Sequence, residues 1–444
     1  MNAFLFKYQF YFATVCCIVV YFILGYLFDR EQFYLLLLLY SAAFIGLIAL
    51  MNTEEYEKTF FKVGVLFRIL LLFSTPALSQ DFYRFIWDGH AILSGINPYQ
   101  YKPEVIINTI ISFPNADYLY DKMGSLSASH FFFFFLINEL FFVYAAFVGG
   151  KFLIISTIVL RMIIILADIG VYHYGRKILV HFNKNTENIF WYFLNPLVIL
   201  ELTGNLHFEG VMLFFLVVGF YYLLTKKWII AAVFIALSIS VKLLPLLLLP
   251  LFLNYLGYIK SVLFYTIIIG LNVLFFLPFL NSTLIANYAE TISLWFTNFE
   301  FNGSIYYVAR EIGFNVKGYN IIHTIGKITP ILTIVIVLFF ALIKKNKSVD
   351  SIITNALVII TLYLFISTTV HPWYVVNLVL LGAFTNFKYT IVWSFTIIFS
   401  YYAYSNFPFK ENLFLIALEY LIVFSVFIYE IKKHRILSRV PKTL

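Results

Sequence analysis

The chain has 444 residues, of which 62% are hydrophobic and only 12% are charged, and its mean hydropathy is +0.91. Soluble domains are roughly half apolar and about 25% charged. This composition therefore excludes a water-soluble fold and predicts an all-α, polytopic membrane protein. The net charge of +8 does not indicate nucleic-acid binding, because the basic residues lie mostly in short segments between apolar runs, where they set topology.

Apolar runs of spanning length follow one another along the chain, and they predict one integral membrane domain over residues 1–444. A membrane-crossing helix needs about 20 mostly apolar residues. The run 228–256 is too long for one crossing and contains Pro245 and Pro250, so we expect two helices or a broken pair there. The predicted runs, in chain order, are 10–28, 32–51, 63–79, 131–148, 153–174, 188–204, 208–224, 228–256, 260–280, 321–343, 351–369, 373–385, 389–405 and 412–431.

The distribution of basic residues predicts the membrane topology. We place the N-terminus in the cytoplasm and let 131–148 lie along the outer surface, because most Lys and Arg then fall on the cytoplasmic side. This arrangement has about 12 to 14 transmembrane helices. It puts a first outer loop, 80–152, and a second outer loop, 281–320, on the non-cytoplasmic face, where we expect one shared site.

The most polar stretch follows the predicted crossing at 63–79 and begins with Asp81. Acids beside a membrane helix are costly unless they face water or have a function. Asp81 and Asp88 are seven residues apart, so on a helix they would share a face about 10 Å apart along the axis, too far to share a proton. A carboxylate near a hydroxyl can act as general base, which makes both acids catalytic candidates. Alternatively, one caps a helix and the other pairs with Arg84.

Several motifs together resemble the GT-C superfamily of membrane glycosyltransferases. The first outer loop contains Asp81-x-x-Arg84-x-x-Trp87-Asp88-Gly89 and then Gly95-x-Asn97-Pro98-Tyr99. The resemblance is to bacterial polyprenol-phosphate-mannose-dependent mannosyltransferases and to GPI mannosyltransferase I. Further motifs that agree in order are Leu194-Asn195-Pro196-Leu197, Gly204-Asn205-Leu206-His207-Phe208-Glu209-Gly210, Ser240-Val241-Lys242-Leu243-Leu244-Pro245 and His371-Pro372-Trp373-Tyr374.

The resemblance implies an inverting enzyme that moves a hexose, with mannose the expected sugar, from a polyprenyl-phosphate donor. The acceptor would be a hydroxyl on a lipid-linked glycan, a lipid or a protein, and Asp81 would be the general base. The expected location is a bacterial inner (plasma) membrane, with the site facing the periplasm or exterior. Eukaryotic relatives have an Asp-x-Asp pair where this chain has one acid, so we expect no metal and no cofactor. The family's Tyr-Pro-Pro segment is also missing from residues 130–139.

Other polar side chains in apolar surroundings are candidates for substrate binding. A buried cation needs an anion, so Lys242, Arg161 or Arg84 would stabilise the donor phosphate. Alternatively, Lys242 extends to the interface or pairs with Glu201, and Arg161 pairs with another helix. The substrate-binding candidates are Arg84, Arg161, His207, Glu209, Lys242, His371 and Trp373.

The expected roles of the remaining candidates differ. His207 and Glu209 would recognise sugar hydroxyls, although an acid near a helix N-terminus is favourable by itself. His371 and Trp373 would bind phosphate or stack on a sugar, although Trp is also common at membrane interfaces. Glu300 or Asn302 in the second outer loop would contact substrate, the alternative being a capped loop helix. We predict that Asp81, Lys242 and His371 line a single cavity on the outer side.

Two other functions fit part of this pattern. A lipid-linked glycan flippase or transporter would also cross the membrane many times, but such proteins bind at the bilayer midplane and often contain inverted repeats. No similarity between the two halves is evident here. An O-antigen polymerase or ligase would also use lipid-linked sugars, but would be expected to rely on arginines of the outer loops.

Overall fold

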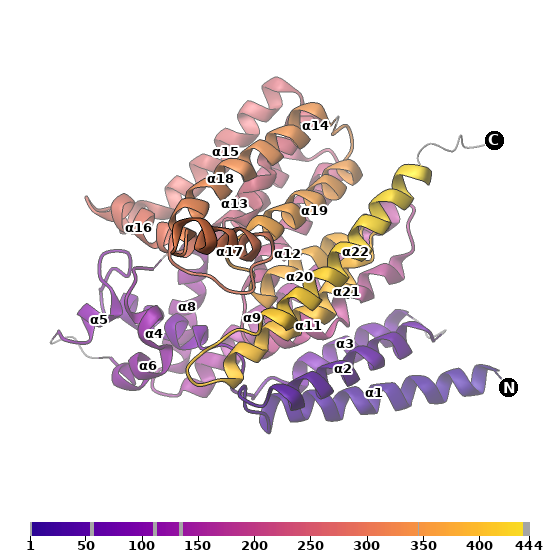
Figure 1. Ribbon diagram of the computed structural model, residues 1–444, viewed down its shortest axis with the longest axis horizontal. Helices are drawn as coiled ribbons and strands as arrows, with labels where there is room; N and C mark the ends of the chain where they lie inside the picture. Colours follow the sequence, from indigo (N-terminus) through magenta and orange to yellow (C-terminus); the bar gives the residue numbers. More distant parts are fainter. Residues whose placement is uncertain (1, 54–56, 110–112, 133–135, 345, 438–444) are drawn as a thin grey trace.

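The computed structural model describes residues 2–53, 57–109, 113–132, 136–344 and 346–437. Within these ranges the secondary structure is helical, apart from one isolated parallel bridge between Phe301 and Thr369. The predicted all-α class is confirmed. In Figure 1 the helices from α4 to α8 gather with α16 on the side of the molecule opposite the two chain ends.

Seven helices in the described ranges are long and apolar enough to cross a membrane. An eighth span is added if the bent pair Pro196–Gly204 and Glu209–Leu224, at 113°, counts as one crossing. The protein is therefore a polytopic membrane protein. The seven helices are α1 (Asn2–Tyr26), α2 (Phe33–Met51), α9 (Leu153–His181), α15 (Tyr258–Phe276), α18 (Ile322–Leu338), α19 (Val349–Ile366) and α22 (Leu413–Leu437).

Seven or eight spans are fewer than the 12 to 14 expected, because several apolar runs do not continue as one α-helix. In the run 228–256, α13 (Trp228–Val241) ends before Lys242, and a 3-10 helix with Pro245 near its start and Pro250 inside follows. Proline lacks the backbone donor and interrupts an α-helix. The prediction of a broken pair is confirmed here.

The other helices are shorter and connect or cover the long ones. Part of the predicted run 131–148 falls on residues 133–135, which lie outside the described ranges. The shorter helices are α3 (Glu57–Leu70), α4 (Asp81–Leu93), α5 (Pro103–Ile106), α6 (Ala116–Met123), α7 (Ser125–Ala128), α8 (Leu136–Gly149), η1 (Thr186–Ile189), α10 (Phe190–Phe193), α11 (Pro196–Val198), η2 (Ile199–Gly204), α12 (Glu209–Leu224), η3 (Leu244–Phe252), α14 (Leu253–Leu256), η4 (Leu277–Phe279), α16 (Leu284–Thr297), α17 (Ile305–Lys317), η5 (Phe339–Ile343), α20 (Pro372–Ala383), α21 (Tyr389–Thr396) and η6 (Ile397–Ser405).

Helix α4 is held in place by close packing against α8. Gly89 faces α8, and a Cβ at this position would lie 2.3 Å from the carbonyl oxygen of Phe142. No side chain fits in that space, so the glycine of the Trp-Asp-Gly motif allows the two backbones to approach. This contact fixes the helix that begins with Asp81.

The two predicted outer loops pack against each other. Lys102 forms an ion pair with Glu290 at 3.0 Å, and the Asn287 amide donates to the carbonyl of Tyr99 at 2.9 Å. A turn follows α4, with Gly95 at a φ of 79°. Asn97 shapes that turn by accepting a hydrogen bond from the N–H of Tyr99 at 3.0 Å. The turn residues thus join the first loop to the segment around α16.

Candidate active site

One cavity of about 440 Å³ lies where the start of α4 meets the break after α13, the end of α16 and the segment before α20. Its wall includes Asp81, Arg84, Lys242, His371 and Trp373. The prediction that Asp81, Lys242 and His371 line one cavity is confirmed, and its placement on the outer side stays a prediction. These residues are far apart in the sequence, so the tertiary fold brings them together.

Asp81 is the first residue of α4, and the Ser79 hydroxyl accepts a hydrogen bond from its backbone N–H. Among the residues that the structure describes, no side chain donates to the Asp81 carboxylate. Burial raises the pKa of Asp81 to about 6 against the opposing charge of Lys242, and the charge of Glu209 adds to the rise. Such a carboxylate is ionised at neutral pH and is a stronger base than an ordinary aspartate.

Arg84 lies one helical turn after Asp81, on the same face of α4. Its Nε donates to Asp88 at 2.7 Å, and its Nη1 donates to the carbonyl of His130 at 3.3 Å. Its Nη2 is buried and has no hydrogen-bond partner in the described part of the chain. A buried donor without an acceptor is costly, so this cavity-lining guanidinium is suited to bind an anion.

Asp88 does not line the cavity, in contrast to the expectation that it acts in catalysis beside Asp81. It is 1% exposed and forms the buried ion pair with Arg84, which is the alternative that the sequence left open. A guanidinium held at one nitrogen by a carboxylate has a fixed orientation. Asp88 therefore positions Arg84.

Lys242 occupies the break between α13 and η3, and its Nζ donates to Glu209 at 2.5 Å. The partner is Glu209 and not Glu201, which instead accepts a hydrogen bond from the Tyr401 hydroxyl at 2.6 Å. Glu209 is the first residue of α12, where a negative charge is favourable. Lys242 lines the cavity, whereas Glu209 lies behind it.

An aromatic stack closes one side of the cavity. The His207 ring lies parallel to Trp373 with centroids 3.7 Å apart, and the His371 ring lies parallel to it at 4.3 Å. Two rings this close to one indole centre fit only on its opposite faces. Trp373 therefore has no free face for a sugar, and the predicted stacking role does not fit. His207 itself lies outside the cavity wall.

His371 remains suited to contact a neutral substrate. Burial lowers the pKa of His371 to about 3, and the charge of Lys242 acts in the same direction. The ring is neutral at physiological pH, so in the predicted binding of phosphate His371 could contribute a hydrogen bond but no positive charge. Its Nδ1 is buried without a hydrogen-bond partner in the described ranges, so it can accept from or donate to a sugar hydroxyl.

Arg161 lies outside the cavity wall, and its hydrogen bonds are made within the protein. Its three nitrogens donate to the carbonyls of Thr203 at 2.7 Å, Leu72 at 2.8 Å and Gly204 at 3.1 Å. Two of these carbonyls end the π-helix η2, and helix C-termini favour a cation. The candidate role of Arg161 in phosphate binding is therefore replaced by a structural one.

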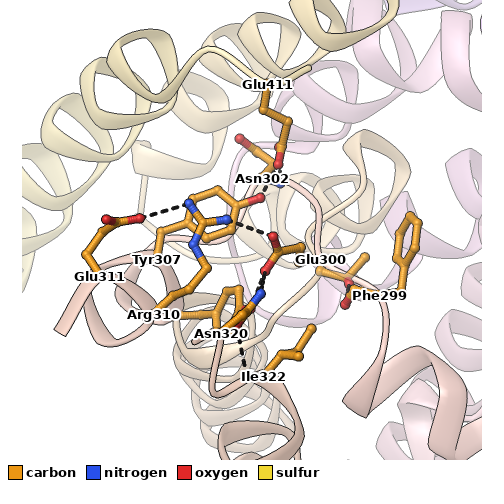
Figure 2. Close-up of polar contacts among 11 residues, drawn as sticks. Phe299, Glu300, Asn302, Tyr307, Arg310, Glu311, Asn320, Ile322 and Glu411 are labelled. Atoms are coloured by element: carbon orange, nitrogen blue, oxygen red, sulfur yellow. Dashed lines mark hydrogen bonds and ion pairs between the residues drawn. The ribbon is translucent and has the colours of Figure 1, made fainter. Parts of the chain in front are cut away.

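Glu300 and Asn302 do not line the cavity, and Figure 2 shows their polar contacts with neighbouring side chains. Glu300 accepts from Arg310 at 2.7 Å and from Asn320 at 3.2 Å, and the backbone N–H of Asn302 donates to Glu411 at 2.6 Å. Between them, the N–H of Val370 donates to the carbonyl of Phe301 at 2.8 Å. The polar contacts thus anchor loop 299–302 beside a cavity-lining segment.

The cavity also contains residues that the sequence did not single out. They come from the connection between α1 and α2, the loop after α7, the end of α16 and η6. Arg30 lies between two acids in the sequence, Asp29 and Glu31, a pattern typical of a solvated loop. Only the tertiary fold brings it to the cavity. The missed residues are Arg30, Gln80, His130, Trp295 and Tyr404.

The profile of the family described as "Alpha-(1->6)-mannopyranosyltransferase, N-terminal domain" matches residues 33–257, just over half of the chain. The chain belongs to this family. No curated protein and no solved structure matched the sequence.

Membership of this mannosyltransferase family identifies the protein as a glycosyltransferase. The matched residues run from α2 to the end of α14 and include Asp81, Arg84 and Lys242. His371 and Trp373 lie beyond the matched part and complete the cavity of the mannosyltransferase.

Proposed function

We propose that this mannosyltransferase moves mannose from a polyprenyl-phosphate donor to a hydroxyl acceptor, with inversion at the sugar carbon, in the cavity at the start of α4. We further propose that its fold is of the GT-C type and that the cavity opens on the non-cytoplasmic face of a bacterial inner membrane. The observation that carries the proposal is the placement of Asp81, with its raised pKa, one helical turn from Arg84, whose Nη2 has no hydrogen-bond partner among the described residues.

Asp81 serves as the general base. The acceptor oxygen attacks C1 of the mannose while its proton passes to the Asp81 carboxylate. The bond between C1 and the phosphate oxygen breaks, and polyprenyl phosphate leaves with the electron pair. Asp81 then releases its proton to water. Attack from the face opposite the leaving group inverts the configuration, and no covalent sugar–enzyme bond forms.

Arg84 binds the phosphate as negative charge builds up on the leaving oxygen. Its Nη2 supplies an unused hydrogen bond, and its Nε is fixed by Asp88. Lys242 adds positive charge to the same cavity wall, although its ammonium group also forms an ion pair with Glu209. Charge placed in advance at a leaving group lowers the barrier more than it strengthens ground-state binding.

The rest of the cavity fits a lipid-linked sugar. Phe85, Ile292 and Phe296 give the wall an apolar part, which suits the first units of a polyprenyl chain. The neutral ring of His371 offers its Nδ1 to a sugar hydroxyl. The site thus combines a carboxylate for the acceptor proton with a cation and an apolar surface that suit a lipid-phosphate sugar donor.

The proposal is tested by transfer of radiolabelled mannose from polyprenyl phosphate in proteoliposomes. Asp81→Asn should lower kcat about 10²- to 10⁴-fold, the contribution typical of a general base. The matched control is Asp117→Asn, an exposed acid in the first turn of α6, which should leave the rate unchanged. Wild-type rates in Asp81→Asn, or movement of the donor across the bilayer without transfer, would overturn the proposal.

A further inference from the structure

Helix α17 is held between the ends of two membrane-spanning helices and takes no part in the mechanism above. At its start, the Ser304 hydroxyl donates to the carbonyl of Phe365, in the last turn of α19, at 2.8 Å. At its end, residues 318–321 lead directly into α18. The Thr329 hydroxyl of α18 donates to the carbonyl of Ile366, the last residue of α19, at 3.4 Å. The start of α18 and the end of α19 therefore lie on the same side of the bundle.

A helix attached at both ends in this way lies along the membrane surface. α17 has 13 residues, so it is about 20 Å long. Because both of its ends are held at span ends on one side of the bundle, its axis cannot run down through the bilayer. This is also the side of the cavity, because Ser367, Thr368 and Thr369 directly follow α19 and line the cavity wall.

The side chains of α17 form three faces. Tyr306 and Tyr307 are buried against the protein. Away from them lies an apolar stripe at helical spacing, whose side chains are 48% to 71% exposed. The stripe consists of Ile305, Val308, Ile312 and Val316. Glu311 and Asn315 are exposed along one edge of the stripe. An exposed apolar face beside a polar edge is typical of a helix that lies in the interface of a bilayer.

The segments joined to α17 also expose apolar side chains. Ile331 and Val335 are exposed on α18, and Leu413 and Phe414 are exposed at the start of α22. Both of these helices are long and apolar enough to cross the membrane, so such side chains face lipid. The stripe on α17 adds to this lipid-facing surface, and acyl chains would remove its aliphatic groups from water.

The face of α17 opposite the stripe supports the cavity wall. Arg310 donates to Glu300 at 2.7 Å, as Figure 2 shows. Glu300 lies between Phe299 and Phe301 in the chain. Both of these rings stack on His371, with centroids 5.8 Å and 5.0 Å away. The position of α17 is therefore transmitted to the ring that offers its Nδ1 to the sugar.

We propose that α17 is a membrane-surface helix whose apolar stripe inserts among phospholipid acyl chains, just below the headgroups on the cavity side. Insertion sets the depth of α17 and, through Glu300, holds His371 at the level where a lipid-linked substrate presents its headgroup. The link to the substrate rests on the proposed function, whereas the insertion of the stripe does not depend on it.

Insertion is tested by fluorescence quenching in vesicles of phosphatidylcholine and phosphatidylglycerol. An NBD label on Ile312→Cys should be quenched by a nitroxide near the top of the lipid acyl chain and shielded from aqueous iodide. The matched control is Glu311→Cys on the polar edge, which should show the reverse. Both variants are made in a Cys16→Ala, Cys17→Ala background, because the native cysteines lie in α1. Equal iodide quenching at the two positions would overturn the insertion.

The same label distinguishes lipid from a second copy of the chain. If the stripe faces lipid, quenching of the Ile312→Cys label by the nitroxide stays constant when the protein is diluted in the bilayer. If a second copy covers the stripe, quenching rises on dilution, and that result would also overturn the insertion.

Transfer of mannose in the same vesicles tests the link to the cavity. Ile312→Asp should lower the rate about tenfold, comparable to the loss of one buried aliphatic side chain. Ile312→Trp should keep the rate, because Trp is favoured at membrane interfaces. The matched control is Asn315→Asp, which adds the same charge on the polar edge and should also keep the rate.

An unchanged rate in Ile312→Asp would overturn the link between the stripe and the cavity. A wild-type protein that transferred no mannose would instead contradict the proposed function. The quenching measurement needs no turnover, so that failure would leave the result for α17 standing.

Discussion

At the scale of single residues, Asp81 and Asp88 lie on one helix, two turns apart, in different surroundings. Asp81 lines a cavity and has no side-chain donor in the described part of the chain, whereas Asp88 is tied to Arg84. Burial raises the pKa of both carboxyl groups, and Arg84 opposes the rise at Asp88. Their different contacts therefore predict different responses to pH and to substitution.

The activity should fall as the pH drops through about 6, the pKa of Asp81. The general base must be ionised, so its protonation removes activity at a pH about two units above the ordinary pKa of aspartate. The measurement is kcat/KM between pH 4.5 and 8. Asp88→Asn separates the two acids: the loss near pH 6 should persist in this variant if Asp81 causes it. A profile that stays flat down to pH 4.5 would contradict the assignment.

The same pKa has a consequence for stability. Because the folded state raises the pKa of Asp81, its contribution favours folding below the unfolded pKa and is lost as the pH rises through about 6. At neutral pH the ionised side chain is less favourable in the folded protein than in water. Asp81→Asn should therefore keep or raise the Tm at pH 7.5, so that a loss of transfer reports on chemistry and not on folding.

At the scale of elements, the contact between α4 and α8 depends on the absence of a side chain at Gly89. Gly89→Ala would place a methyl group 2.3 Å from the carbonyl oxygen of Phe142, so the helices must separate. We expect a loss of about 1–3 kcal/mol of stability, as for other overpacked interiors, and reduced transfer because α4 carries Asp81. Thermal unfolding and the transfer assay check both effects.

Gly270→Ala is the matched control for this substitution. Gly270 lies in α15, and a Cβ at this position would meet no atom within 4 Å. Alanine also favours the helix over glycine, so this variant should keep or slightly raise the Tm. Equal behaviour of the two variants would contradict the role given to Gly89 in the contact between the helices.

The loop beside the cavity offers a second test at this scale. Glu300 accepts hydrogen bonds from Arg310 and Asn320, and the neighbouring Phe299 lines the cavity. Glu300→Gln should weaken these contacts and raise the donor KM severalfold, with little change in the pH profile. Glu311→Gln removes the other acid bound to Arg310 (Figure 2), but that pair is exposed and contributes little. An equal effect of both variants would contradict the anchoring role of Glu300.

At the scale of the whole molecule, the sequence predicted the class of fold and part of the site. Composition determines the all-α membrane class, and local motifs brought out Asp81, Lys242 and His371. The roles of other side chains depend on partners that are distant in the sequence. The faces of Trp373 are covered by His207 and His371. Arg161 donates hydrogen bonds to backbone carbonyls of two other segments. Such contacts leave no periodic signal in the chain.

The position of the aromatic stack has a consequence for how enzymes of this kind diversify. His207 lies within the matched residues 33–257, whereas Trp373 and His371 lie beyond them. In the proposed mechanism, the residue that takes the proton therefore lies early in the chain, and a residue that contacts the sugar lies late in it. Chimeras joined after α14 with another member of the family should therefore change which sugar is preferred and leave the proposed proton transfer to Asp81 intact.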